Sequence, residues 1–185
     1  MKYIIEHFEP ELFEWCMIEY EHISKLVGSE NLLFTNVKQK TPSLAALGKV
    51  SKESIHELKL PNACILDPEA KQTLSKQDSS FDYLILGGIL GDDPPQKRTT
   101  QELSTKLSYP TRNLGKDQFA TDTAVIVAQK LLLGTNLATI KFIAELEVET
   151  GDDESVILPF KYVVEGEKTL VSPKLLAYLK THDGF

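Results

Sequence analysis

The chain has 185 residues, of which 42% are hydrophobic, and this suits one well-packed α/β core. It carries 20 Lys and Arg against 27 Asp and Glu, and the net charge of −7 disfavours a phosphate backbone as partner and favours a basic one. Because no apolar stretch has the length of a membrane helix, charge begins too early for a secretory signal and only two cysteines occur, we expect a cytoplasmic protein without membrane attachment.

Short apolar runs predict the strands of a parallel sheet. Five runs have the length and the flanking polar or glycine residues expected of strands: 2–5, 31–37, 63–66, 83–86 and a weaker one near 112–114. Their solid apolar character is typical of strands that are buried on both faces. Helical patterns lie between them, so we expect an α/β fold with a mainly parallel sheet and helices on both faces.

Two segments carry the clearest helical spacing of apolar residues. In the segment 10–27, Pro10 can occupy the first turn and Gly28 can end the helix. In the segment 117–133, Asp117 is placed to cap the N-terminus. Weaker patterns predict short helices that start near 41 and 54.

The pattern changes near residue 140. Apolar residues alternate over 142–148 and 156–164, on either side of an acidic turn at 151–154, and this predicts an antiparallel hairpin. A short helix follows from Pro173. We expect one domain over 1–185, with about 140–185 as an appendage.

Polar residues and glycines follow the predicted strands. In a parallel sheet the carboxyl ends of the strands meet at one rim, and ligands bind there. The strand ends lead to Glu6-His7, Asn36, Asp67-Pro68, 87–93 and 115–117. The sequence therefore predicts a small-molecule site at this rim, and His7 is the one histidine that we expect near it.

The segment 87–93 is the most informative of these. Its glycines let a ligand approach the backbone, whose polar groups can bind an adenine edge. The spacing is not GxGxxG and no GK[ST] follows, so neither a dinucleotide fingerprint nor a phosphate loop is present. A tight structural turn is the alternative, just as Asp67-Pro68 can bind a hydroxyl or form an aspartate turn. No HExxH, Cys/His or GxSxG pattern indicates a metal site or a nucleophile.

Four sequence blocks together resemble a known family. The blocks KYIIEHFEPELFEWCMIEY, CILDP, FDYLILGGILGDDPPQKRT and RNLGKDQFATDTAVIVAQ, in this order, resemble one branch of the SPOUT superfamily of knotted methyltransferases. That branch includes a fungal protein-arginine methyltransferase acting on a small-subunit ribosomal protein, and archaeal relatives often regarded as RNA methyltransferases. The resemblance implies a C-terminal trefoil knot, S-adenosylmethionine as cosubstrate, and a monomer. The segment between the second and third strands is shorter here than in the fungal pattern.

The resemblance also implies the residues that bind the cosubstrate. They lie in three rim loops: Leu66, Asp67, Pro68, Gly87, Gly88, Ile89, Leu90, Gly91, Leu114, Gly115, Gln118, Thr121 and Asp122. Backbone groups of 88–90 and 114–115 would hold the adenine and ribose. No metal is implied.

Methyl transfer to arginine requires positioning and removal of a proton, work that suits carboxylates. Glu6, Asp67 and Asp92 are the rim candidates, and we assign Glu6 and Asp92 to the acceptor. We expect an enzyme that methylates an arginine of a basic small-subunit ribosomal protein. One alternative is an RNA methyltransferase of the same fold, which would use a local basic patch of Lys97, Arg98, Lys106 and Arg112. The other is a non-catalytic S-adenosylmethionine-binding module.

Overall fold

The computed structural model describes residues 1–39, 41–91, 96–151 and 154–181. The strands are β1 (Lys2–His7), β2 (Leu32–Thr35), β3 (Lys49–Val50), β4 (Ala63–Leu66), β5 (Tyr83–Gly88), β6 (Thr111–Arg112), β7 (Lys141–Ile143), β8 (Leu146–Gly151), β9 (Glu154–Leu158), β10 (Tyr162–Glu165) and β11 (Lys168–Thr169). The helices are α1 (Glu14–Val27), α2 (Pro42–Leu47), α3 (Thr121–Leu132) and α4 (Pro173–Leu179), with short helical segments η1 (Ser29–Asn31), η2 (Lys76–Ser80), η3 (Thr100–Ser104) and η4 (Leu137–Thr139). Within these ranges no helix has the length and apolar character to cross a membrane.

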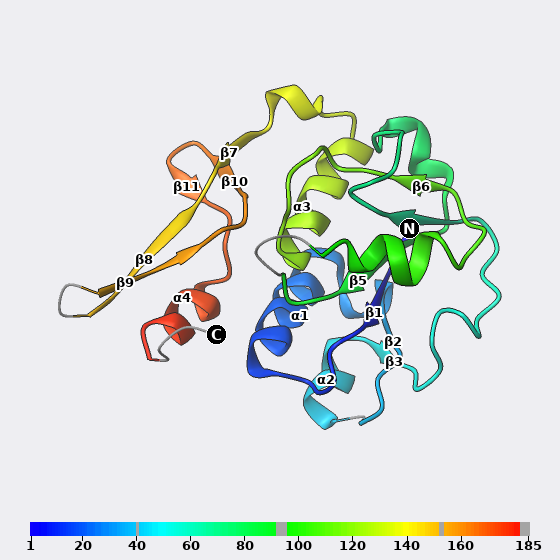
Figure 1. Ribbon diagram of the computed structural model, residues 1–185, viewed down its shortest axis with the longest axis horizontal. Coiled ribbons are helices and arrows are strands. Elements are labelled where there is room, and N and C mark those ends of the chain that lie inside the picture. Colours follow the sequence, from blue (N-terminus) through cyan, green and yellow to red (C-terminus); the bar gives the residue numbers. More distant parts are fainter. Residues whose placement is uncertain (40, 92–95, 152–153, 182–185) are drawn as a thin grey trace.

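A six-stranded parallel sheet forms the centre of the molecule (Figure 1), which confirms the predicted α/β class. The strand order is β3-β2-β1-β5-β4-β6, and every neighbouring pair is parallel. β1 lies between β2 and β5, with Ile4 opposite Leu33 on one side and Ile85 on the other. The chain first proceeds from β1 to β2 and β3, and then adds β4 and β5 on the opposite side of β1. This reversal creates a switch point beyond the carboxyl ends of β1 and β5, where ligands bind in such sheets.

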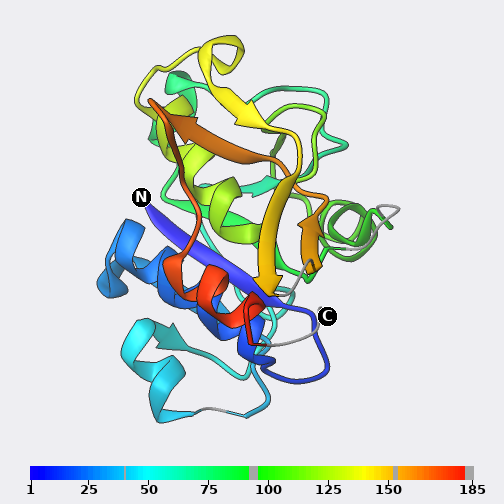
Figure 2. The same ribbon diagram turned by 90° about the vertical axis from the view of Figure 1, so that its left-hand side faces the viewer.

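Residues 141–179 form an arm beside the sheet core (Figures 1 and 2). β7, β10 and β11 make a three-stranded antiparallel sheet, whereas β8 and β9 pair only with each other. Pro159 follows β9 at the break between the two sheets, and it has no N–H to donate to a ladder. The predicted antiparallel hairpin is therefore present, but it is divided into two sheets.

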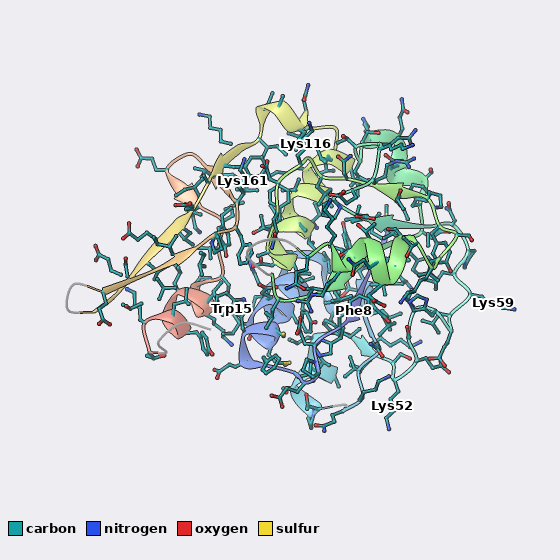
Figure 3. The ribbon with its side chains drawn as sticks, in the orientation of Figure 1. Phe8, Trp15, Lys52, Lys59, Lys116 and Lys161 are labelled. Atoms are coloured by element: carbon teal, nitrogen blue, oxygen red, sulfur yellow. The ribbon has the colours of Figure 1, made fainter. Side chains whose placement is uncertain are left out.

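A hydrophobic cluster attaches the arm to α1. Leu158, Tyr162 and Leu175 are fully buried, and they belong to the same cluster as Trp15 of α1. The Trp15 indole packs edge-on against Tyr178 of α4, with 6.2 Å between ring centroids. Figure 3 shows Trp15 at this junction of α1 and the arm.

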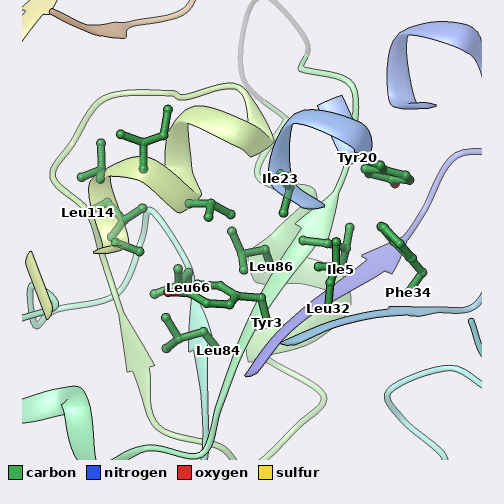
Figure 4. Close-up of a cluster of buried hydrophobic side chains, with 14 of the residues drawn as sticks. Tyr3, Ile5, Tyr20, Ile23, Leu32, Phe34, Leu66, Leu84, Leu86 and Leu114 are labelled. Atoms are coloured by element: carbon green, nitrogen blue, oxygen red, sulfur yellow. The ribbon is translucent and has the colours of Figure 1, made fainter. Parts of the chain in front are cut away.

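The sheet is buried on both faces because alternate side chains of each strand point in opposite directions. Ile5 and Leu86 contact the cluster that includes side chains of α1 and α3 (Figure 4). Ile4 and Ile85 lie on the other face with Leu103 of η3. Each such side chain contributes about 1.5–3 kcal/mol through burial, so both faces stabilise the strands that lead to the rim.

The helix α3 begins later than the sequence pattern predicts. Residues before Thr121 pair with the arm instead: Phe119 forms a β-bridge with Lys161, and the Lys161 N–H donates to the carbonyl of Gln118 at 3.2 Å. Asp117 therefore does not cap the helix, and its carboxylate lies 2.9 Å from the Lys161 ammonium.

Two other predictions about helices are wrong. The helix α1 begins at Glu14, and Pro10 precedes it in the loop after β1. The segment from Ser54 to Leu60 forms turns, because the Ile55 N–H donates to the buried carboxylate of Glu6 at 3.0 Å and fixes the segment against β1. The strand order does not establish the trefoil knot, which stays a prediction.

Candidate functional site

A cavity of about 390 Å³ lies beyond the carboxyl ends of β4 and β5. Three parts of the chain supply its wall. They are residues 66–69 after β4, then Leu86, Gly87, Ile89, Gly91 and 96–100 from the end of β5 to η3, and finally 114–119 with Thr121 and Ala124 of the first turn of α3. The rim of the sheet therefore holds a pocket at the place that the strand ends predict.

Ten of the thirteen residues predicted to bind the cosubstrate line this cavity. They are Leu66, Asp67, Pro68, Gly87, Ile89, Gly91, Leu114, Gly115, Gln118 and Thr121. The other three, Gly88, Leu90 and Asp122, lie outside its wall. The structure thus brings the three predicted loops together around one space.

Gly87 and Gly88 face different surroundings although they are neighbours. A Cβ atom on Gly87 would lie 2.9 Å from Ile89 Cδ1 and 3.0 Å from Thr99 Oγ1, and these three residues all line the cavity. A Cβ atom on Gly88 would lie 2.4 Å from the Tyr20 hydroxyl, inside the core. The absent side chain at 87 therefore leaves room beside the ligand site, whereas the one at 88 allows close packing of β5 against α1.

The backbone of Leu90 is held by two charged side chains. Its N–H donates to Glu9 Oε1 at 2.9 Å, and its carbonyl accepts from Arg98 Nη2 at 2.6 Å. Glu9 and Arg98 also pair with each other at 3.1 Å. The two hydrogen bonds and this ion pair hold the loop that follows β5 in place.

Asp67 combines the two roles that the sequence left open. Its Oδ1 accepts the Glu69 N–H at 2.9 Å, which is the hydrogen bond of an aspartate turn, and also the Thr100 hydroxyl at 2.8 Å. The residue is 3% exposed yet lines the cavity. Its carboxylate joins the loop after β4 to η3 and retains acceptor capacity towards a ligand hydroxyl.

The loop 113–119 requires glycine at one position. Gly115 has φ +113°, a conformation that residues with a Cβ atom rarely adopt, and its N–H donates to Asn113 Oδ1 at 3.0 Å. The Asn113 amide in turn donates to the carbonyl of Ala70 at 2.7 Å, which connects this loop to the one after β4.

Glu6, assigned to the acceptor from the sequence, lies beneath the rim and outside the cavity wall. Its fully buried carboxylate accepts hydrogen bonds from the Ser54 hydroxyl at 2.5 Å, from the Ile55 N–H at 3.0 Å and from the Thr35 hydroxyl. This geometry gives Glu6 a role in joining β1, β2 and the loop after β3. Its role in acceptor recognition stays a prediction. Asp92, the second assigned carboxylate, lies outside the described residues.

His7 also lies outside the cavity wall. Its Nδ1 is 2.8 Å from the Tyr20 hydroxyl, and burial lowers the pKa of the imidazole. The neutral ring therefore belongs to the packing between β1 and α1. Among the described residues, no group of three or more His, Cys, Asp and Glu side chains is placed to hold a metal ion.

A pair of buried carboxylates lies behind the cavity wall, and the sequence did not point to it as a pair. Glu19 of α1 is 5% exposed and Asp122 of α3 is fully buried. Glu19 accepts a hydrogen bond from the Trp15 indole at 2.9 Å, and Asp122 lies 2.6 Å from His22 Nδ1. Burial, and then the charge of Asp122, raise the pKa of Glu19 to about 8. Hydrogen bonds from Trp15 and from the side chain and backbone of Thr121 act in the opposite direction.

The chain and its structure match one family of known proteins. The family described as protein arginine N-methyltransferase SFM1-like matches residues 2–184. The protein arginine N-methyltransferase SFM1 of Saccharomyces cerevisiae is 37% identical over 198 residues, which cover 94% of this chain and 91% of the yeast protein.

Solved structures agree with this match. The yeast arginine methyltransferase SFM1 complexed with S-adenosylmethionine (SAM) superposes with a TM-score of 0.85 and 33% identity, covering 97% of this chain and 90% of that one. Its complex with S-adenosylhomocysteine (SAH) gives a TM-score of 0.85 at 32% identity, over 97% and 94% of the two chains. A dual-specific Trm10 protein from Thermococcus kodakaraensis, with a TM-score of 0.54 and 15% identity over 74% of this chain and 95% of that one, shares the fold alone.

Proposed function

This chain belongs to the SFM1-like family of protein arginine N-methyltransferases, and from that membership we propose that it transfers a methyl group from S-adenosylmethionine to an arginine of a basic ribosomal protein. The observation that carries the proposal is the rim cavity, which gathers the three glycine-containing and polar loops of the sequence around one space. The yeast relative has been solved with the methyl donor and with its demethylated product, which supports the same cosubstrate here.

The cavity residues fit this cosubstrate. Apolar side chains of Leu66, Leu86 and Leu114 suit an adenine ring, and the buried carboxylate of Asp67 suits a ribose hydroxyl. Gly87 lets the cavity side chains of Ile89 and Thr99 pack closely over its backbone, because a Cβ atom there would meet them at 2.9 and 3.0 Å. When bound, the sulfonium of the donor supplies an electrophilic methyl group, and the protein contributes chiefly by positioning donor and acceptor.

The charge of the protein supports a basic polypeptide as acceptor. The four basic residues that could form an RNA patch each pair with a carboxylate: Lys97 with Glu69, Arg98 with Glu9, Lys106 with Glu102, and Arg112 with Asp78. Their charge is largely neutralised locally. The arm instead exposes Glu145, Glu147 and Glu149, and a net charge of −7 attracts a cationic partner.

Labelled cosubstrate supplied with the purified protein to a cell extract tests the acceptor. We expect label in material that protease digests and ribonuclease leaves intact, with methylarginine found by mass spectrometry in a ribosomal protein. Label released by ribonuclease would favour the RNA alternative. Cosubstrate binding without any transfer would favour a non-catalytic module.

The resemblance to knotted methyltransferases supports two further parts of the proposal, a C-terminal trefoil knot and a monomeric state. A cytoplasmic location is a further part, and the presence of only two cysteines supports it. Light scattering of the purified protein tests the monomeric state, since a mass near 20.7 kDa is expected for the monomer.

A further inference from the structure

The buried carboxylate pair behind Thr121 has more negative charge than its surroundings neutralise. Asp122 has His22 as a partner at 2.6 Å, and the Thr123 N–H donates to it at 2.7 Å. Among the described residues, the groups that interact with Glu19 apart from Asp122 are neutral: the Trp15 indole donates to it, and Thr121 faces it. An ionised carboxylate that is buried without a cation is costly, so this position favours either a proton or an arriving positive charge.

A second observation points to the same place. The hydroxyl of Tyr162 on β10 is fully buried and has no hydrogen-bond partner among the described residues. Tyr162 packs in the same buried cluster as Ala120, which precedes Thr121, and Trp15, whose indole donates to Glu19. A buried hydroxyl without a partner costs about 1–3 kcal/mol, so it indicates that a polar group joins the cluster in the working enzyme.

Thr121 connects this cluster to the cavity. It lines the cavity wall, and its side chain and backbone N–H face Glu19 and act to lower the pKa of that carboxyl. A hydroxyl has one hydrogen and two lone pairs, so a threonine that donates to Glu19 can still accept an N–H from the cavity side. The cavity wall thus offers a hydrogen-bond acceptor with a carboxylate directly behind it.

We propose that the acceptor guanidinium binds against Thr121, and that Glu19 is the positioning residue that attracts this cation and takes up its proton through the Thr121 hydroxyl. The inference rests on the proposed arginine methyltransferase function. As the nitrogen–carbon bond forms, the sulfur–carbon bond of the donor breaks and its electron pair stays on sulfur. The nitrogen loses one proton to the Thr121 oxygen while the Thr121 hydroxyl proton passes to Glu19, which later releases it to solvent. The products are methylarginine, S-adenosylhomocysteine and one proton.

Glu19 also has a purely structural explanation. The N-cap of α3, Ala120, has no side chain that can cap the helix, and a carboxylate that faces the Thr121 N–H can stabilise this end of α3. A cap alone would affect stability and leave the chemical step unchanged in the folded enzyme. The test must therefore separate turnover from folding and from cosubstrate binding.

Four variants make this separation: Thr121→Val, Thr121→Ser, Glu19→Gln and Glu21→Gln. Valine keeps the shape of threonine without its hydroxyl, and serine keeps the hydroxyl. Glu21 lies on the same helix but is paired at the surface with Lys25 and Lys174, so it is the matched control. Thermal unfolding confirms that each protein is folded, calorimetry measures cosubstrate affinity, and turnover is measured on the purified acceptor protein.

We expect Thr121→Val and Glu19→Gln to lower kcat by about 100-fold or more, the usual contribution of a positioned proton acceptor. In Glu19→Gln, which leaves the cavity wall intact, cosubstrate affinity should change less than about threefold. Thr121→Ser and Glu21→Gln should keep kcat within about fivefold of the parent, a change that is small beside that contribution. If folded Glu19→Gln or Thr121→Val turns over at the parental rate, the inference is overturned. It is also overturned if the cosubstrate affinity of these variants falls by the same factor as their kcat. If Glu19→Gln does not fold, the valine and serine variants decide. A parent protein that binds cosubstrate and methylates no arginine would overturn the proposed function as well.

The dependence of kcat on pH separates the two explanations of Glu19, because a helix cap alone would not change it. The titratable groups that face Glu19 are Cys16 and Tyr20 on α1, Asp122 on α3 and Tyr162 on β10. Burial raises the pKa of the Cys16 thiol to about 12 and those of both tyrosines above their ordinary values, so these three stay neutral near pH 7. We expect kcat of the parent to rise with pH as Glu19 ionises, and that rise to be absent in Glu19→Gln. An unchanged rise in the variant would overturn the role of Glu19.

Discussion

The parallel sheet and the arm differ in burial: the sheet is buried on both faces, and the arm on one. Ile4, Ile5 and Ile85, on neighbouring strands of the sheet, are fully buried although they point to both faces. In the arm, one face of β8 and β9 packs inward through Val148 and Leu158, whereas Ile157 on the other face is 53% exposed. The parallel sheet is therefore held from both faces, whereas β8 and β9 of the arm are held from one face and leave the other to solvent.

This difference separates two kinds of functional residue. The cosubstrate loops extend from strands that are packed on both faces, so a substitution there should alter stability where the side chain meets the core and cosubstrate binding where it meets the cavity. The acidic side chains of β8 protrude from a surface that few residues support. Substitutions there should alter only the encounter with a partner. The following predictions test this separation, from the largest expected effect to the smallest.

Gly88→Val should have the largest effect, because the new side chain would clash with Tyr20 and with Ile5 Cγ2, 2.7 Å from its Cβ atom. Overpacking of this kind costs about 3 kcal/mol in the free energy of unfolding. The matched change Gly87→Ala meets only side chains of the cavity and should weaken cosubstrate binding with little change in stability. Urea denaturation and calorimetry on both variants measure the two effects. A fully stable Gly88→Val protein that has lost binding would assign Gly88 to the ligand site instead.

Glu6→Gln should destabilise the protein by about 1–3 kcal/mol, because one carboxylate oxygen that accepts hydrogen bonds from Thr35, Ser54 or Ile55 becomes an amide donor. Cosubstrate affinity should stay near the parental value, since Glu6 does not line the cavity. Thermal unfolding and calorimetry test this. A stable variant with slow methyl transfer would instead support the assignment of Glu6 to the acceptor.

Stability should depend on pH through Glu19. Its pKa is raised from 4.5 to about 8, so the folded state favours the protonated form. The protonated carboxyl therefore contributes its full share to the free energy of unfolding below about pH 4.5, and this contribution is lost as the pH rises through 8. Between pH 5 and 9 the parent should therefore lose more than about 1 kcal/mol relative to Glu19→Gln, since one unit of pKa shift corresponds to about 1.4 kcal/mol. Parallel denaturation curves of the two proteins at all pH values would show that Glu19 does not titrate in this range.

Charge reversal on the arm should have the smallest effect. Glu149→Lys should change the free energy of unfolding by less than about 0.5 kcal/mol, because the side chain is exposed on β8. It should raise the KM for a basic acceptor about two- to threefold, and added salt should reduce the difference. Glu30→Lys, an exposed substitution at the opposite end of the sheet, is the control. Equal KM values for both variants would show that the arm does not attract the acceptor.

The sequence predicts the sheet and its rim well because buried parallel strands have a simple signature. The runs that became β1, β2, β4 and β5 are solidly apolar, and glycine and aspartate mark where they end. The two-residue strand β3 has no such pattern. Nor does the glycine pair at 87–88 reveal that only Gly87 faces the cavity, because that depends on the pleat of β5 against α1.

Long-range pairing explains the remaining differences. Glu19 lies in a helical pattern where a carboxylate is ordinarily a solvated residue, and only the tertiary structure brings Thr121 and Asp122 against it. The late start of α3 has a similar cause, because Lys161 of the arm pairs with the preceding residues. Periodicity describes one segment at a time and does not contain such pairings.

The contact between the arm and the cosubstrate loops has a consequence for biosynthesis. Phe160 closes on Gly91, where a Cβ atom would lie 2.4 Å from the ring, and Lys161 is tied to Gln118 and Asp117. All strands of the parallel sheet leave the ribosome before these two residues do, so the sheet can form while the cavity still lacks this support. We therefore expect competence to bind the methyl donor to follow synthesis of the arm, and a chain that stops before residue 160 to form its sheet without the contacts that support its pocket.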